Sequence, residues 1–153
     1  MAIFLGNGDG TVQNEVDYQI PWGGYHAAVA DLNGDGKLDI LISGFSVLLG
    51  NGDGTFTVGT SFDLQDDWNS PIQIADMNGD GKVDLVTVTS NFGHDIETLN
   101  IVLGVGNGTF RKAILLPAPF GTQTGGIADF NGDGLLDVAL GGTSTVLLQI
   151  PSK

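Results

Sequence analysis

The chain has 153 residues, of which 41% are hydrophobic, 18 are acidic, 5 are basic and none is cysteine. This composition predicts one folded domain rather than a disordered acidic segment. The formal net charge of -13 at pH 7 repels a phosphate backbone and anionic lipid, so we expect neither nucleic acid nor a membrane as a partner. No apolar run is long enough to span a membrane, no signal peptide is evident, and the lack of cysteine excludes disulfides and thiolate metal sites.

A glycine-rich turn motif comes first in chain order and returns twice. Its copies are FLGNGDGTV at 4–12, LLGNGDGTF at 48–56 and VLGVGNGTF at 102–110. In the third copy Asn107 stands where the earlier copies have Asp9 and Asp53, so a carboxylate is lost while an Asx-Gly pair between two apolar runs is kept. Such a pair is typical of a type I′ hairpin turn, and we interpret this motif as a structural turn and not as a metal site.

Short segments on both sides of a second, acidic motif predict β-strands. Small residues precede the motif in HAAVAD, IQIAD and GGIAD, at 26–31, 72–76 and 125–129, and suit strands that converge around a propeller axis. Apolar runs too short for helices follow it, as LDILIS, VDLVTVT and LDVAL at 38–43, 83–89 and 136–140. We therefore expect an all-β fold of propeller blades, three antiparallel repeats of four strands, with strands that are apolar on both faces because each sheet packs between two others.

The acidic motif has the spacing of a calcium-binding loop. Its copies are DLNGDGKLD at 31–39, DMNGDGKVD at 76–84 and DFNGDGLLD at 129–137, each with Asp, Asn, Asp and Asp at positions 1, 3, 5 and 9. Oxygen ligands on alternate residues, with a glycine for the sharp turn and the carbonyl of position 7, can surround Ca2+. An EF-hand requires Glu at position 12, where this chain has Ile42, Thr87 and Leu140, so the loops are not EF-hands.

We predict about three calcium ions per chain, one in each acidic loop. Mg2+ is a poorer candidate because it retains its waters and seldom takes an all-protein cage. The alternative is a solvated loop rich in Asx turns, but three identical copies with Asp at position 9 favour a metal. The predicted ligands, with the residue at position 7 acting through its carbonyl, are Asp31, Asn33, Asp35, Lys37, Asp39, Asp76, Asn78, Asp80, Lys82, Asp84, Asp129, Asn131, Asp133, Leu135 and Asp137.

Together these motifs resemble a known repeat. The run DLNGDGKLDILI followed by VLLGNGDGTF is similar to the FG-GAP or VCBS-type repeat, the blade of integrin alpha-subunit propellers and of many extracellular bacterial proteins. The resemblance implies four-stranded blades, calcium in the hairpin between strands one and two, and ligands on the opposite face or between blades. Members include adhesion receptors, lectins and polysaccharide-degrading enzymes, so the resemblance does not select one function.

The number of repeats bears on assembly. The copies form a single three-repeat unit over 1–153, at about 6–49, 50–103 and 104–150, and they are permuted relative to blades. Because a propeller needs about four to eight blades, three repeats do not close a ring. We hypothesise that chains associate head to tail as a homodimer, with two chains forming a six-bladed propeller. The alternatives are a fragment of a larger propeller and an open array.

One aromatic residue lies eight or nine positions before each acidic loop, namely Trp22, Trp68 or Phe120. These connections are expected on the face away from the acidic loops, where aromatic rings beside small polar residues can stack on sugars. The alternative is that each ring wedges between neighbouring blades as part of the core. A glycan or protein ligand is therefore a predicted partner, besides a second copy of the chain.

No motif indicates an enzyme. The chain has two histidines, His26 and His94, and neither a G-x-S-x-G nor an HExxH motif. The insertion SNFGHDIETL at 90–99 occurs only in the middle repeat and gathers His94, Asp95 and Glu97, and we interpret it as a solvated surface loop. We expect a module for binding or adhesion and no catalysis.

Two alternatives remain open, a purely structural scaffold stiffened by calcium and a non-catalytic part of a polysaccharide-degrading enzyme. Calcium sites in modules of this kind often need extracellular calcium concentrations, which predicts an extracellular or cell-surface location.

Overall fold

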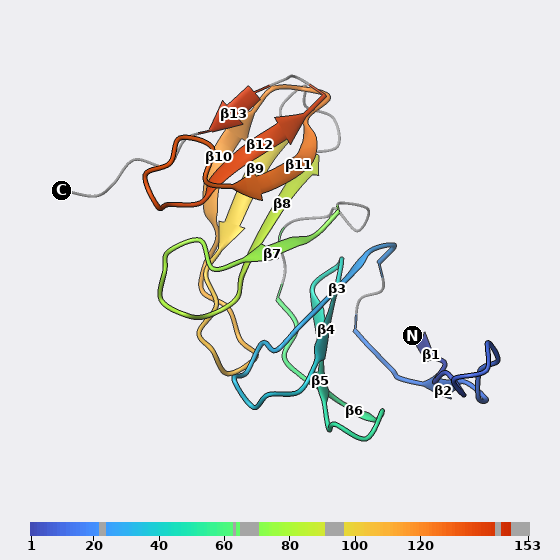
Figure 1. Ribbon diagram of the computed structural model, residues 1–153. Coiled ribbons are helices and arrows are strands. Elements are labelled where there is room, and N and C mark those ends of the chain that lie inside the picture. Colours follow the sequence, from blue (N-terminus) through green and yellow to red (C-terminus); the bar gives the residue numbers. More distant parts are fainter. Residues whose placement is uncertain (22–23, 63, 65–70, 91–96, 143–144, 148–153) are drawn as a thin grey trace.

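The computed structural model describes residues 1–21, 24–62, 64, 71–90, 97–142 and 145–147, and every regular element among them is a β-strand. None of these described segments is a helix of the length and apolarity that crossing a membrane requires. Figure 1 shows the strands grouped into separate small sheets that follow one another along the chain. The prediction of an all-β fold is confirmed.

The strands form one hairpin and three sheets, all with antiparallel neighbours. The opening hairpin pairs β1 (Ala2–Ile3) with β2 (Val16–Asp17). The first sheet contains β3 (Ala27–Ala30), β4 (Asp39–Ile42), β5 (Ser46–Gly50) and β6 (Phe56–Val58). The second contains β7 (Gln73–Ala75), β8 (Asp84–Ser90), β9 (Glu97–Val102) and β10 (Ile114–Ala118). The third contains β11 (Gln123–Ala128), β12 (Asp137–Gly141) and β13 (Thr145–Leu147).

The sheets match the predicted blades with one difference. Two sheets have four strands, as predicted, whereas the third has three strands in the part of the chain that the structure describes. Each sheet is a meander in which neighbours in sequence are neighbours in space, because short connections favour antiparallel pairing. The predicted repeat boundaries, the closed ring and the homodimer stay predictions.

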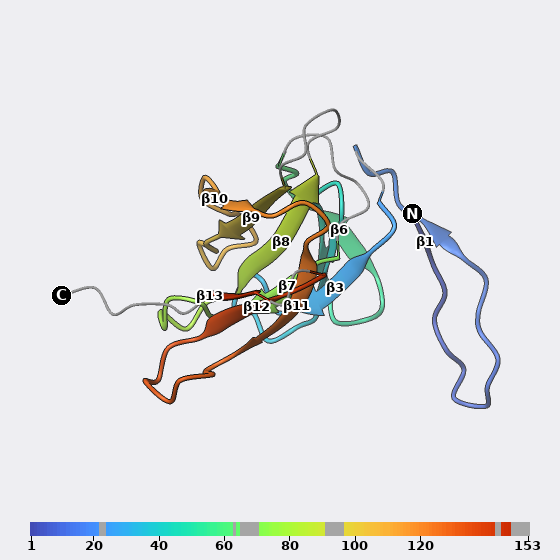
Figure 2. The same cartoon turned by 90° about the horizontal axis from the view of Figure 1, so that it is seen from above.

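The small inner strands lie next to one another, as the propeller interpretation requires. Strand β3 contacts β7, and β7 contacts β11 (Figure 2). Gln73 on β7 also donates a hydrogen bond from its side-chain amide to the carbonyl of Gly125 on β11, at 3.3 Å. Alanine and glycine on these strands permit the close approach because their side chains are small.

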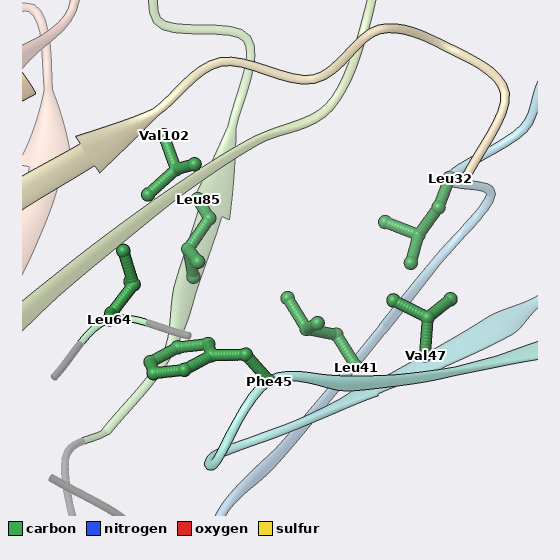
Figure 3. Packing of buried hydrophobic residues seen from close by; sticks show 7 residues of the cluster. All are labelled: Leu32, Leu41, Phe45, Val47, Leu64, Leu85 and Val102. Carbon is green, nitrogen blue, oxygen red and sulfur yellow. The ribbon is translucent and has the colours of Figure 1, made fainter. Parts of the chain in front are cut away.

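Two apolar clusters lie between neighbouring sheets. Leu85 and Val86 are adjacent on β8 and therefore point to opposite faces of the second sheet. Leu85 joins the cluster shared with the first sheet and Val86 the cluster shared with the third, so β8 is buried on both faces. The first cluster, drawn in Figure 3, contains Leu32, Leu41, Phe45, Val47, Leu64, Leu85 and Val102. The second contains Met77, Val86, Val88, Leu99, Ala118, Val138 and Leu140.

The opening hairpin contacts the first sheet in the way that the first sheet contacts the second. A Cβ placed on Gly54 would lie 2.7 Å from a side-chain methyl of Leu5, and one on Gly108 would lie 2.9 Å from a methyl of Leu49. Leu5 and Leu49 occupy equivalent positions in the turn motif, as do Gly54 and Gly108. The hairpin therefore packs on the first sheet through a contact equivalent to the one between the first sheet and the second.

The glycine-rich turns are longer than the predicted type I′ turn. A type I′ turn has two successive residues with positive φ, but here the positive values belong to Gly8 and Gly10, on either side of Asp9. The Asp9 carboxylate accepts hydrogen bonds from the backbone N–H and the hydroxyl of Thr11, at 2.9 and 2.6 Å. Asp9 does not have a positive φ, so the prediction of turn type was wrong, although the motif does form a hairpin turn.

The insertion in the middle repeat is not wholly a solvated loop. Ser90 ends β8, and residues 97–99 begin β9, whose partner strands are β8 and β10. Leu99 is fully buried and Glu97 is 7% exposed. The prediction of a solvated loop was wrong for these positions because the extra residues lengthen two paired strands. His94 and Asp95 lie outside the described residues.

Candidate metal-binding loops

The three acidic loops occupy equivalent places in the fold. They join β3 to β4, β7 to β8, and β11 to β12, the first two strands of each sheet. Each loop begins immediately after a small inner strand and ends with the aspartate that starts the next strand. The fifteen predicted ligands therefore lie in three matched loops, as expected from the repeat.

Backbone N–H groups point at the acidic side chains within each loop. In the first loop Asp31 accepts hydrogen bonds from the N–H groups of Gly34 and Gly36, at 2.7 and 2.8 Å. Gly34 and Gly36 both have positive φ, which curls the chain around the Asp31 carboxylate. Asn33 accepts from the N–H of Asp35 at 2.9 Å. The other two loops repeat this arrangement, since Asp76 accepts from Asp80 and Gly81, and Asp129 from Gly132 and Gly134.

These hydrogen bonds favour the ionised form of the first aspartate. The bond from Gly36 lowers the pKa of the Asp31 carboxyl, and that from Gly34 adds to the decrease although partial burial opposes it. In the third loop the bond from Gly134 lowers the pKa of Asp129 in the same way. Both side chains are therefore negatively charged at neutral pH, which is the state that a cation binds.

The aspartate at position 9 has a structural role that the sequence did not reveal. Asp39 is fully buried, and its two carboxylate oxygens accept hydrogen bonds from the N–H groups of Leu32 and Gly50, both at 2.8 Å. Asp84 makes the equivalent bonds to Met77 and Gly104, at 2.9 and 2.8 Å. This residue thus links the acidic loop to the start of the glycine-rich turn. The shared rhythm of the two motifs along the chain was the only signal of this link.

Like charges accumulate in the second loop. Burial raises the pKa of the Asp84 carboxyl, hydrogen bonds from Gly104 and Met77 oppose the increase, and the negative charges of Asp80 and Asp76 add to it. A divalent cation in this loop would remove that repulsion between carboxylates.

The loops differ at position 7, where the first two have a lysine and the third has none. The ammonium Nζ of Lys37 lies 3.5 Å from Oδ2 of Asp35, and Nζ of Lys82 lies 3.5 Å from Oδ2 of Asp80. The third loop has Leu135 at this position. Three aspartates and one lysine leave a charge of 3 − 1 = 2 negative units on each of the first two loops, whereas the third keeps 3.

The described side chains do not gather around a common point. Among the residues that the structure describes, no group of three or more carboxylates and imidazoles is close enough to hold a metal ion. The side-chain oxygens turn toward backbone N–H groups instead, although a carboxylate oxygen has lone pairs for more than one partner. The donor types and the excess negative charge fit a hard cation, and the ligand assignment stays a prediction.

The structure describes one of the three predicted aromatic residues. Phe120 is 68% exposed and lies in the connection between β10 and β11, at the opposite end of β11 from the acidic loop. Its ring therefore does not wedge into a core, which agrees with a surface position on the face away from the acidic loops. Trp22 and Trp68 lie outside the described residues.

A cleft that no motif predicted separates the opening hairpin from the first sheet. It has a volume of about 480 Å³, and its lining includes Tyr18, Tyr25 and His26. Tyr25 is 82% exposed. Sequence reasoning named His26 only as one of two histidines, since residues brought together by packing leave no local pattern.

Comparison with protein families accounts for the repeats. The model described as FG-GAP-like repeat matches residues 1–42, 43–87 and 76–140, which together span most of the chain. The chain belongs to the FG-GAP-like repeat family. Each acidic loop of this FG-GAP-like chain falls inside a matched segment. Searches of curated proteins and of solved structures find no significant match.

Proposed function

We propose that this FG-GAP-like, β-propeller-like module binds calcium in its three acidic loops and mediates binding rather than catalysis. The observation that carries the proposal is the repeated acidic loop. All three copies keep three carboxylates on a nine-residue turn, against one lysine or none. Close carboxylates repel one another, and a bound cation would relieve that repulsion at all three equivalent positions.

The predicted ligands have distinct roles in each loop. In the first, Asp31, Asn33, Asp35 and Asp39 would supply side-chain oxygens and Lys37 its carbonyl. Calcium would neutralise the loop and tie the first strand of each blade to the second. Ion binding to the folded state stabilises that state by mass action.

Thermal unfolding of the full chain in calcium and in a chelator tests the proposal. We expect a melting temperature that rises with calcium concentration, and titration calorimetry should give about three sites per chain. The variant D31N/D35N should lose one site. The matched control D9N/D53N changes the same residue type in the glycine-rich turns and should keep all sites. An unchanged melting temperature with calcium would refute the metal assignment.

We further propose that the chain self-assembles into a six-bladed ring of two copies. The opening hairpin supports this idea because it packs on the first sheet as a preceding blade would, through the contact of Leu5 with Gly54. In a two-chain ring, the third sheet of the partner would supply the inner strands of that blade. Native mass spectrometry should show two chains with about six calcium ions, and a monomer at micromolar concentration would contradict the ring.

Phe120 favours a ligand on the face opposite the acidic loops. Its ring is exposed beside the exposed Gly121, a surface on which a sugar or a protein side chain can stack. We propose adhesion to a glycan or a protein, in an extracellular or cell-surface setting. Glycan-array binding that survives W22A/W68A together with F120A would exclude this surface. A calcium-stabilised scaffold, or a non-catalytic part of a polysaccharide-degrading enzyme, would then be the better description.

A further inference from the structure

A pocket between the first and second sheets is distinct from the acidic loops and from Phe120. Its volume is about 390 Å³, which is within the range of small-molecule sites. Phe62 and Leu64, which follow β6, line one side. The other side is formed by β8, β9 and the chain that leads from the glycine-rich turn into β10.

Two features of the middle repeat that the first lacks converge on this pocket. The first is strand length, because β8 has 7 residues and β9 has 6, whereas β4 and β5 have 4 and 5. The added length brings Thr89 and Thr98 to the pocket. The second is the basic pair Arg111 and Lys112, which replaces Thr57 and Val58 of the first repeat.

The basic pair brings two positive charges to the described lining of the pocket. Arg111 and Lys112 are two of only 5 basic residues in the chain. Both are exposed, and neither forms an ion pair with another residue in the described part of the chain. They lie between the bridge at Phe110 and the start of β10, outside regular strand, so successive side chains can reach the same pocket. An arginine beside a lysine is suited to a carboxylate.

The wall of the pocket carries fixed polar groups. Asn100 is 2% exposed, and its amide donates hydrogen bonds to the Thr89 hydroxyl and to the Thr98 carbonyl, both at 2.9 Å. These bonds fix the orientation of the Asn100 amide and of the Thr89 hydroxyl. Hydroxyl and amide groups held in this way are typical of sites that recognise ligand hydroxyls.

The remaining lining is aromatic and aliphatic. The rings of Phe62 and Phe110 lie 4.8 Å apart between centroids, at 40°. Each also lines the pocket and is only half-buried, so ring surface is available to a ligand. The C–H face of a sugar ring packs well on such a surface.

We propose that this pocket binds a uronic acid, a pyranose ring that carries a carboxylate. Arg111 and Lys112 bind the carboxylate, the side of the pocket with Thr98 and Asn100 faces the ring hydroxyls, and Phe62 and Phe110 pack on the ring. A neutral sugar would bring the two cations no anionic group. An aliphatic acid would form no hydrogen bonds from ring hydroxyls to the polar wall.

Titration calorimetry of the calcium-loaded full chain with galacturonic acid tests this proposal, with galactose as the neutral analogue. We expect binding of the acid and at least a tenfold weaker interaction with galactose. The variant R111Q/K112Q should also lose about tenfold or more in affinity, since it removes the charge-assisted hydrogen bonds to the carboxylate. Thr98→Val removes one hydroxyl without changing shape and should weaken binding less.

The variant D9N/D53N is the control because it changes two charges in the glycine-rich turns and none in the pocket lining. Its affinity for galacturonic acid should match that of the unchanged protein. Equal binding of galactose, an equal loss in D9N/D53N, or no binding of the acid at millimolar concentration would overturn the proposal. The calcium-dependent melting temperature is measured in parallel, so failure of this site and failure of the calcium proposal are separate results.

Discussion

The tetrapeptide Asn-Gly-Asp-Gly occurs in an acidic loop at 33–36 and in a glycine-rich turn at 51–54, and the two copies have different surroundings. Both glycines have positive φ in both copies, so the local backbone path is similar. In the loop the tetrapeptide is flanked by Asp31 and Asp39, which accept bonds from backbone N–H groups. In the turn it is followed by Thr55, which donates two bonds to Asp53, at 2.9 and 2.6 Å.

The comparison shows that the flanking residues, and not the shared tetrapeptide, give each segment its role. In the loop, the flanking aspartates add negative charge, and Asp39 connects the loop to the sheet through its hydrogen bonds. A threonine on one side satisfies Asp53 within the turn and closes a hairpin. Four predictions test this distinction, in order of decreasing effect.

Removing the buried aspartate should have the largest effect. Asp39→Ala leaves the N–H groups of Leu32 and Gly50 without their acceptor inside the protein, and we expect a loss of about 3–5 kcal/mol in the free energy of unfolding. Asp53→Ala, in the turn copy, removes bonds from an exposed side chain only and should change stability little. Urea unfolding of both variants in a chelator measures the difference. Equal losses would mean that the flanking residues do not distinguish the two segments.

Adding a methyl group at Gly50 should have the second-largest effect on stability. The added Cβ would lie 2.2 Å from the carbonyl oxygen of Leu38, at the end of the acidic loop, and we expect Gly50→Ala to cost about 3 kcal/mol. Gly6 is the equivalent residue of the opening hairpin, and a Cβ there meets no atom within 4 Å. Gly6→Ala is therefore the matched control, with an expected change within about 0.5 kcal/mol. Similar melting temperatures for the two variants would contradict the predicted close approach.

The third loop should bind calcium more tightly than the first two, since it lacks their lysine. Leu135→Lys introduces the missing charge, and we expect calcium to bind about threefold more weakly at this loop because an exposed charge contributes little. Lys37→Leu should strengthen the first loop by a similar factor. Calorimetric titration of each variant resolves the effect, and a change of opposite sign would show that loop charge does not set affinity.

Low pH should reduce the stability contributed by the second glycine-rich turn, which contains Asp53, but not that of the third, which contains Asn107. The Thr55 hydroxyl, followed by its N–H, lowers the pKa of the Asp53 carboxyl from 3.8, so its stabilising contribution is present above pH 3.8 and is lost as the pH falls through the lower folded value. Asn107 accepts the equivalent bonds from Thr109 without a charge. Asp53→Asn should therefore remove a small acid-dependent term from the stability profile, measured in a chelator below pH 3.8. An unchanged profile would mean that Thr55 does not favour the charged form.

Much of the fold was predictable because each unit repeats. Apolar runs too short for helices located the strand that follows each acidic loop, and small residues before the acidic loops identified the inner strands. The turn type was not predictable from Asn-Gly and Asp-Gly pairs, because Thr11, which lies outside the pair, donates its N–H and its hydroxyl to the Asp9 carboxylate. The extent of β8 and β9 was missed because propensity alone did not show that Leu99 packs into a core.

The sequence by itself determined the repeat, the family and the positions of the acidic loops, because these follow from local spacing along the chain. Only the tertiary structure decided that Asp39 is buried against Gly50, since the two residues belong to different strands of one sheet. It also decided that Phe62 and Arg111 line one pocket. Contacts of this kind depend on how neighbouring sheets pack, and packing joins residues that no local pattern relates.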